Sequence, residues 1–240
     1  MPASIPIVAL DVSSTLEAMT IAEQLGESCR FYKVGSELFV SEGPSIVRVL
    51  QDELGADVFL DLKFHDIPNT VAGAVRRASD LGVRLTTVHA SGGLAMLQAA
   101  QAAAGPTCGV LGVTVLTSFG AEGLARAWGR PSLRIAAEVM RLAADAATAG
   151  LHGVVCSGAE AGMVASVHPG LALLVPGIRL PGGAEHDQER VETPAGAQAS
   201  GARYLILGRA VTAAADRRAA MGQVLAELVQ SASGGGAEDR

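Results

Sequence analysis

Short apolar runs alternate with longer segments of helical periodicity from one end of the chain to the other. The runs are rich in Val, Ile and Leu and are bounded by Gly, Pro or polar residues, which is typical of the buried strands of a parallel sheet. We therefore predict strands at residues 5–10, 30–34, 57–62, 84–89, 108–116, 151–156, 171–175 and 204–207.

Helical patterns fill the segments between these strands. Capping residues or prolines mark several helix starts, as at Ser13, Pro44 and Pro68. A long loop that contains Gly and Pro, at 177–191, follows the seventh strand. The predicted helices cover residues 13–26, 44–54, 68–81, 92–103, two parts of 118–149 with a break near 129–131, a short stretch from 159, and 210–229.

The regular alternation predicts a parallel sheet with helical crossovers. Eight strand–helix units fit an α/β fold, a single-domain (β/α)8 TIM barrel over residues 1–230, followed by a flexible C-terminal tail at 231–240. The alternative is an open doubly wound sheet, which usually has a Gly-rich turn after its first strand. This chain has Asp11-Val12-Ser13-Ser14 there, with no glycine.

Composition narrows the class of protein. Of the 240 residues 49% are hydrophobic and 18% are charged, which suits a large core and excludes general disorder. The net charge of -6 disfavours a nucleic-acid-binding surface. We expect no membrane association, because no apolar run approaches the roughly 20 residues that span a bilayer. Three separated cysteines and an N-terminus without a basic leader indicate the reducing cytoplasm.

Lysine is almost absent from the chain. Of the 18 basic residues only Lys33 and Lys63 are lysines, and the other 16 are arginines. Arginine replaces lysine easily as a surface cation, but not where a compact charge or a transferable proton is needed, because guanidinium stays protonated. The two lysines are therefore candidates for a chemical role.

Charged residues stand where the first three strands end. Asp11 follows the first strand, Lys33 lies near the end of the second, and Asp61 and Lys63 close the third. In a barrel the carboxyl ends of the strands form the active-site rim, and residues two apart on a strand share a face. The pattern predicts carboxylates and ammoniums interleaved at that rim, with Asp66 one turn further on. A network that only closes the rim, with Asp66 as a helix cap, is the alternative.

A second group of polar residues follows the last two strands. Arg179 and Gln188 lie in the loop after strand seven, and Gly208 and Arg209 follow strand eight. These two loops often form a phosphate site in barrels, where backbone amides and a bidentate Arg meet an anion. We predict phosphate binding there, against the alternative of a surface arginine.

Several weaker candidates lie near the same rim. The hydroxyls of Thr114, Thr117 and Ser118 end the fifth strand and could meet a polar ligand edge or cap the next helix. His65 and His89 are more often packing or hydrogen-bonding residues in such positions.

The segment DLKFHDIPNT at residues 61–70 closely resembles the signature of the orotidine 5'-monophosphate decarboxylases. The shorter D-x-K-x-x-D pattern also occurs in 3-keto-L-gulonate 6-phosphate decarboxylases and hexulose phosphate synthases, where a metal-binding Glu typically stands at the position of Lys33. Ala210 departs from the family, which usually has Pro there. The resemblance covers nearly the whole chain, through residues 9–11, 32–35, 113–118, 176–179, 187–188 and 208–209.

The resemblance implies roles for the residues at the strand ends. Asp11 and Lys33 are expected to hold the ribose hydroxyls, and Asp61 to lie beside the substrate carboxylate. Lys63 is expected to protonate C6 of the pyrimidine. Asp66 and Thr70 are expected to reach the site from the partner subunit of a homodimer.

The resemblance also assigns the remaining contacts and the reaction. It puts Thr117 and Ser118 at the pyrimidine edge, lets Gln188 link pyrimidine and phosphate, and puts Arg179, Gly208 and Arg209 on the phosphate side. The implied reaction converts orotidine 5'-monophosphate to uridine 5'-monophosphate in pyrimidine biosynthesis, without metal or other cofactor. A metal-dependent sugar-phosphate lyase and a non-catalytic nucleotide-binding protein are the alternatives.

Overall fold

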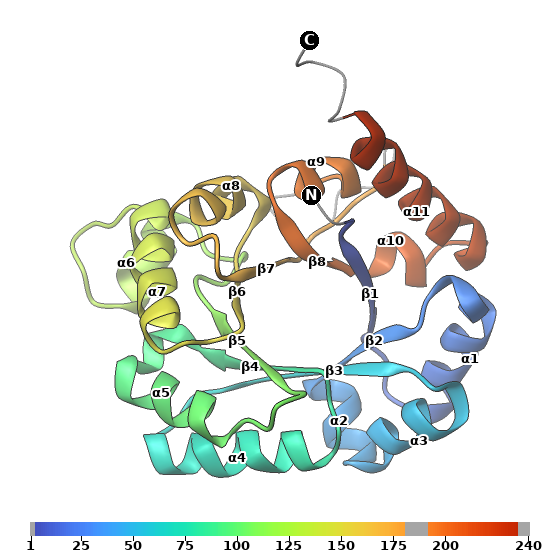
Figure 1. The fold of residues 1–240 in the computed structure, drawn as a ribbon, viewed down its shortest axis with the longest axis horizontal. Helices are drawn as coiled ribbons and strands as arrows, with labels where there is room; N and C mark the ends of the chain where they lie inside the picture. Colours follow the sequence, from blue (N-terminus) through green and yellow to red (C-terminus); the bar gives the residue numbers. More distant parts are fainter. Residues whose placement is uncertain (1–2, 181–191, 235–240) are drawn as a thin grey trace.

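Eight parallel strands close into a barrel in the computed structural model, which describes residues 3–180 and 192–234. Neighbouring strands pair in chain order, and β8 pairs with β1 to complete the ring (Figure 1). The predicted TIM barrel is confirmed, and the open doubly wound sheet is wrong. The strands are β1 Ile5–Leu10, β2 Phe31–Gly35, β3 Asp57–Phe64, β4 Leu85–His89, β5 Gly109–Val113, β6 Gly153–Val155, β7 Ala172–Val175 and β8 Ala202–Leu207.

Helices surround this ring on the outside, as Figure 1 shows. None of the described helices is long and apolar enough to cross a bilayer. The helices are α1 Thr15–Leu25, α2 Ser36–Glu42, α3 Ser45–Leu54, α4 Pro68–Asp80, α5 Leu94–Ala103, α6 Ala121–Ala127, α7 Ile135–Thr148, α8 Gly158–Val167, α9 Pro194–Ala199, α10 Arg209–Thr212 and α11 Arg217–Gly234.

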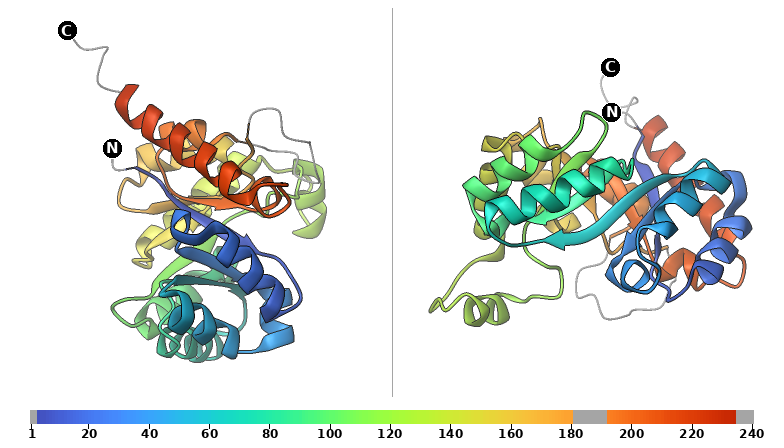
Figure 2. Two further views of the ribbon diagram at one scale, coloured as in Figure 1. Left: turned by 90° about the vertical axis from the view of Figure 1, so that its right-hand side faces the viewer. Right: turned by 90° about the horizontal axis from the view of Figure 1, so that it is seen from below.

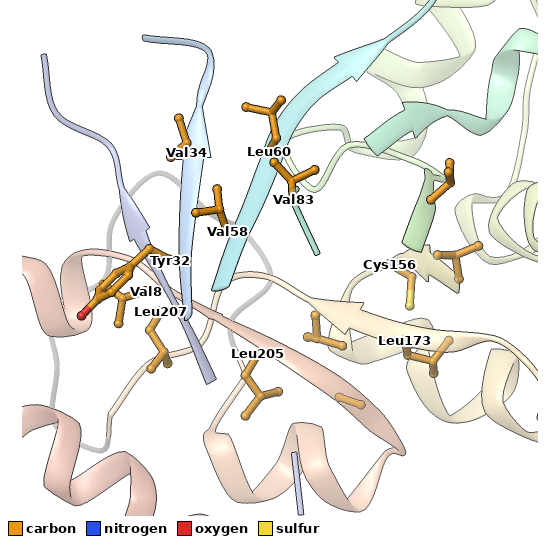
Figure 3. Packing of buried hydrophobic residues seen from close by; sticks show 14 of the residues in the cluster. Val8, Tyr32, Val34, Val58, Leu60, Val83, Cys156, Leu173, Leu205 and Leu207 are labelled. Atoms are coloured by element: carbon orange, nitrogen blue, oxygen red, sulfur yellow. The ribbon is translucent and has the colours of Figure 1, made fainter. Parts of the chain in front are cut away.

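Alternation along each strand divides the core into two layers. One set of side chains packs between the strands and the helices, and includes Tyr32, Val58 and Leu60 (Figure 3). The other set fills the inside of the barrel, and includes Phe31 and Phe59. Burying both layers is the main stabilising contribution to this fold, since the hydrophobic effect scales with the apolar area removed from water.

Inside the barrel the residue type changes from one end of the strands to the other. On β2 the inward positions pass from Phe31 to Lys33, and on β3 they pass from Phe59 to Asp61. The apolar half supports the barrel, while the carboxyl ends of the strands carry the charge. The closed barrel therefore places the chemically active positions together at one end.

Several element boundaries differ from the predicted ones. The fifth strand ends at Val113, and the backbone N–H and the hydroxyl of Thr114 both donate to the carbonyl of Val155, at 3.2 and 2.7 Å. The short helices α2 and α9 were not predicted, since neither is long enough to show a helical period. The two-part stretch after β5 is confirmed as α6 and α7, and Figure 2 shows α6 standing out from the barrel body.

The C-terminal helix is divided and longer than predicted. A single helix at 210–229 was expected, but α10 ends at Thr212 and α11 begins at Arg217. The carboxylate of Asp216 accepts the backbone N–H of Ala219 at 2.9 Å, which begins a new helix after the break. Because α11 continues to Gly234, the predicted tail from 231 is helical in its first residues, and residues 235–240 lie outside the described part of the chain.

Candidate active site

Four charged side chains form an alternating row at the carboxyl end of the barrel. Lys33 Nζ lies 2.7 Å from Asp11 Oδ1 and 3.9 Å from Asp61 Oδ2, and Lys63 Nζ lies 2.8 Å from the same Asp61 oxygen. The order is therefore acid, base, acid, base across β1, β2 and β3. These contacts confirm the predicted arrangement of alternating carboxylates and ammoniums at the rim. Both lysines of the chain take part in it.

Burial is uneven along this row. The side chains of Lys33 and Asp61 are 10% and 12% exposed, whereas those of Asp11 and Lys63 are 62% and 38% exposed. Charges buried as deeply as the central pair are costly unless they are paired and hydrogen-bonded, and here each has an opposite charge in contact. The outer two groups remain accessible to a ligand that enters from the rim.

Lys63 reaches the row through an irregular backbone. Its φ angle is +51°, the only positive value for a non-glycine residue in the described part of the chain. The β3–β4 register moves from Leu60–Thr86 to Phe64–Val88, so three residues of β3 lie opposite Thr87 alone. Asp61 and Lys63 therefore lie in a β-bulge. The prediction that regular alternation along the strand places them on one face is wrong, because the strand is irregular between them.

A cavity of about 230 Å³ opens beside the row. Apolar side chains such as Phe59, Leu174 and Ile206 form its floor and walls, and the four charged residues stand at one side. Thr117 also lines it. A larger cavity, of about 590 Å³, lies at the opposite end of the barrel, but neither lysine lines it. A mostly apolar pocket with a few convergent charges is the usual form of a small-molecule site, so the smaller cavity is the candidate active site.

Asp66 and Thr70 lie away from this cavity. Both residues are exposed, and neither lines the cavity in the same chain. Asp66 Oδ1 accepts the backbone N–H of Ile67 at 2.6 Å, while the residue that precedes α4 is Ile67 itself. Asp66 therefore does not cap α4 in the way that the alternative interpretation required.

The hydroxyl candidates separate into three positions. Thr117 lines the cavity, Ser118 is exposed outside it, and Thr114 is bonded to the backbone of β6. The residue before α6 is Gly120, with no side-chain cap, so neither Thr117 nor Ser118 caps the next helix. Of the three, Thr117 is the one that a cavity ligand meets directly.

The predicted phosphate residues follow β7 and β8, which are adjacent strands. The buried Nε of Arg179 has no hydrogen-bond partner among the described residues, while its Nη1 donates to the carbonyl of Ile178 at 3.0 Å. Gly208 precedes α10, and the exposed Arg209 is the first residue of that helix rather than of the long last helix. Gln188 lies outside the described residues.

Two residues around the row were missed by the sequence analysis. The hydroxyl of Thr87, on β4, bonds both the backbone of Lys63 and the carboxylate of Asp61. At Gly35 a Cβ atom would lie 3.1 Å from Lys33 Nζ and 3.2 Å from Asp11 Oδ1, so this position keeps the ion pair uncrowded. A single threonine or glycine carries no signal of such contacts, because the partners come from different strands.

Other reactive side chains near the cavity are poorly suited to catalysis. Burial raises the pKa of the Cys156 thiol to about 12, and the Glu160 carboxylate adds to the rise, so this thiol is not an ionised nucleophile at neutral pH. Burial lowers the pKa of His89, and the charges of His65 and Lys63 lower it further. The two imidazole rings are 5.4 Å apart. Neither Cys156 nor His89 is therefore charged at neutral pH.

Comparison with known proteins identifies relatives over almost the whole chain. The sequence model of the orotidine 5'-phosphate decarboxylase / HUMPS family matches residues 4–224. A Pseudomonas aeruginosa (strain LESB58) protein named orotidine 5'-phosphate decarboxylase is 46% identical over 226 residues, which cover 92% of this chain and 96% of that protein. A Dichelobacter nodosus (strain VCS1703A) protein of the same name is 49% identical over 229 residues, which cover 92% and 97%.

Solved structures agree with these relatives. The crystal structure of orotidine 5'-phosphate decarboxylase from Lactobacillus acidophilus superposes with a TM-score of 0.82 at 33% identity, covering 94% of this chain and 99% of that one. That from Pyrococcus horikoshii OT3 gives a TM-score of 0.77 at 25% identity, covering 94% and 99%. The family match includes Asp11, Lys33, Asp61 and Lys63, and the chain belongs to the orotidine 5'-phosphate decarboxylase / HUMPS family.

Proposed function

We propose that this protein decarboxylates orotidine 5'-monophosphate to uridine 5'-monophosphate, as a carboxy-lyase of pyrimidine biosynthesis. The names of its relatives support this activity. The observation that carries the proposal is the ammonium of Lys63, 2.8 Å from Asp61 at the edge of an apolar cavity. An ammonium in such a place can stabilise a developing carbanion and then protonate it.

The reaction needs little else from the chain. The bond between C6 and the carboxylate carbon breaks, CO2 leaves, and the electron pair stays on C6. Lys63 Nζ gives its proton to that carbon, and the resulting amine takes a proton back from water. Asp61, beside the substrate carboxylate, disfavours the bound substrate relative to the transition state, while Asp11 and Lys33 hold the ribose hydroxyls.

We propose that no metal ion takes part. Lys33 stands between the Asp11 and Asp61 carboxylates, and its ammonium repels a divalent cation from the oxygens that could bind one. The related metal-dependent sugar-phosphate enzymes are expected to have a Glu in place of this lysine. The charge arrangement therefore favours the cofactor-free decarboxylase over the lyase.

An assay tests both parts of this proposal. We expect the purified protein to consume orotidine 5'-monophosphate, followed by its ultraviolet absorbance, at the same rate with and without EDTA. Lys63→Ala is the control for contaminating activity and is expected to be inactive. Absence of turnover contradicts the proposed substrate, and turnover that stops in EDTA and returns with Mg²⁺ contradicts the metal-free mechanism.

The phosphate is proposed to bind between the ends of β7 and β8, where Arg179, Gly208 and Arg209 lie. The family resemblance adds Gln188 as a further contact. Binding there is remote from C6, so its energy can support closure and desolvation at the reacting carbon. The buried Nε of Arg179 supports this location, because it has no acceptor among residues 3–180 and 192–234 and a buried donor gains from an anion.

Arg209→Ala and Gln188→Ala are expected to act mainly through this phosphate. Arg209→Ala is expected to lower kcat/KM by a factor equivalent to about 2–5 kcal/mol, as for truncating one partner of a charge pair that the ligand buries. For Gln188→Ala, which removes a neutral donor to a charged phosphate, the equivalent is about 1.5–3 kcal/mol. The loss should be far smaller with orotidine, which lacks the phosphate. Steady-state kinetics with both substrates measure the difference, and an equal loss with both would remove these residues from the phosphate site.

We also propose a cytoplasmic homodimer with shared active sites, without nucleic-acid or membrane partners. Asp66 and Thr70 are exposed in the single chain, and the apolar side chain of Ile67 between them is 66% exposed. A two-fold interface over this segment would bury Ile67 and bring Asp66 and Thr70 to the neighbouring cavity. The three cysteines are free and buried, which supports a reducing compartment.

A further inference from the structure

We propose that Thr87 is a positioning residue for the decarboxylation, because its hydroxyl fixes both Lys63 and Asp61 in their working geometry. The proposal rests on the proposed function, since it assigns Lys63 and Asp61 to the reaction. It concerns a residue that is not among those that line the cavity.

The backbone of Lys63 needs an external constraint. A lysine with a φ of +51° is in the left-handed region, which side chains with a Cβ atom rarely adopt. Such a conformation persists only where the surroundings over-determine it. Three residues of β3 lie opposite Thr87 alone, so the regular ladder does not supply that constraint here.

Thr87 supplies the missing hydrogen bond. The backbone N–H of Lys63 donates to Thr87 Oγ1 at 2.9 Å, so a side-chain hydroxyl takes the place of a ladder carbonyl. Thr87 is fully buried, and water cannot substitute for it. The hydrogen bond from Lys63 to Thr87 on β4 therefore fixes the direction in which the Lys63 side chain leaves β3.

The same hydroxyl orients Asp61. Thr87 Oγ1 donates to Asp61 Oδ1 at 2.9 Å, which is compatible with the bond from Lys63, because a hydroxyl has one donor and two acceptor positions. Oδ1 is thereby occupied, and Oδ2 is the oxygen that faces Lys63 at 2.8 Å and Lys33 at 3.9 Å. One hydroxyl thus holds the acid and the ammonium of the reacting pair in a single arrangement.

The neighbouring residue offers a matched control. Thr86 is also fully buried on β4, and its hydroxyl donates to the carbonyl of Leu60 at 3.0 Å. Because successive residues of a strand face opposite sides, this bond lies on the helix-facing side of the sheet. Removing either hydroxyl deletes a buried hydrogen bond between β3 and β4, but only Thr87 touches the charged row.

The test compares Thr87→Val with Thr86→Val, since valine keeps the shape of threonine and lacks its hydroxyl. We expect kcat to fall about 10- to 100-fold in Thr87→Val, the size of effect that a misplaced catalytic group produces. Binding of uridine 5'-monophosphate, measured by calorimetry, should change less than about threefold, because ribose and phosphate contacts dominate it. Thr86→Val should lower Tm similarly and keep the native kcat, and Thr87→Ser should restore kcat.

Three results would overturn the proposal. They are a kcat in Thr87→Val equal to that of Thr86→Val, a Thr87→Ser as impaired as Thr87→Val, or a crystal structure of Thr87→Val in which Lys63 is unmoved. If Thr87→Val does not fold, Thr87→Ala takes its place, since it also lacks the hydroxyl. If the native protein itself does not decarboxylate orotidine 5'-monophosphate, the proposed function fails, while the crystal structures still decide whether Thr87 positions Lys63.

Discussion

Replacing Lys63 by arginine is expected to abolish turnover of orotidine 5'-monophosphate while nucleotide binding survives. Arginine keeps the positive charge beside Asp61, but guanidinium does not release a proton to carbon at any working pH. Positioned general acids contribute about 10²–10⁴-fold to rate, so we expect kcat to fall below about one percent of the native value. Single-turnover kinetics measure the loss, and calorimetry with uridine 5'-monophosphate measures binding.

The size of any remaining activity decides what Lys63 does. If Lys63→Arg keeps more than a few percent of the native kcat, charge alone accounts for its effect and the transferable proton is not required. Loss of uridine 5'-monophosphate binding would instead show that the larger guanidinium disturbs the Lys33–Asp61 part of the row. The position of Lys63 at the bulge, with its side chain 38% exposed, gives room for the larger group.

Mixing two inactive variants is expected to restore activity. Lys63→Ala and Asp66→Ala should each be nearly inactive as homodimers, because each damages both sites of its own dimer. In a heterodimer with shared sites, one site carries both substitutions and the other carries neither. After random exchange about half of the dimers are mixed, so activity should return to about a quarter of the native value.

The measurement needs proof that subunits exchange. Tagging the variants with different masses and recording native mass spectra gives the fraction of heterodimer, and the same samples give the activity. Lys63→Ala mixed with Lys63→Ala of the other tag is the control and should stay inactive. Demonstrated exchange without any return of activity would mean that Asp66 serves its own chain.

Most strands and helices of the barrel could be predicted from the sequence, because the local hydrophobic pattern agrees with the fold. The apolar runs matched every strand, and α1 and α3 began within two residues of the predicted starts at Ser13 and Pro44. Two of the predicted bounds failed at hydrogen bonds that the apolar pattern does not encode. At the end of β5 the hydroxyl of Thr114 bonds the carbonyl of Val155 on a neighbouring strand, and the local cap at Asp216 begins α11 after a break in the predicted last helix.

The charged row could also be anticipated, but not its geometry. Asp11, Lys33 and Asp61 lie near the carboxyl ends of three consecutive strands, and in a parallel barrel consecutive strand ends are neighbours. The meeting of Asp61 and Lys63 looked like simple alternation along one strand. In the structure it depends on a bulge in β3 and on a hydroxyl from β4, neither of which has a local signature.

The chemical inventory of this protein is determined by its sequence alone: eight strand–helix units, two lysines in an Arg-rich chain, and carboxylates at the strand ends. The tertiary structure decided which of these side chains are in contact. Closure of the barrel fixes the register between β3 and β4, and this register brings the hydroxyl of Thr87 to Lys63 and Asp61. The physical reason is that periodicity within a strand specifies which face a residue takes, whereas a contact between strands depends on register and bulges, which many residues far apart in the sequence set together.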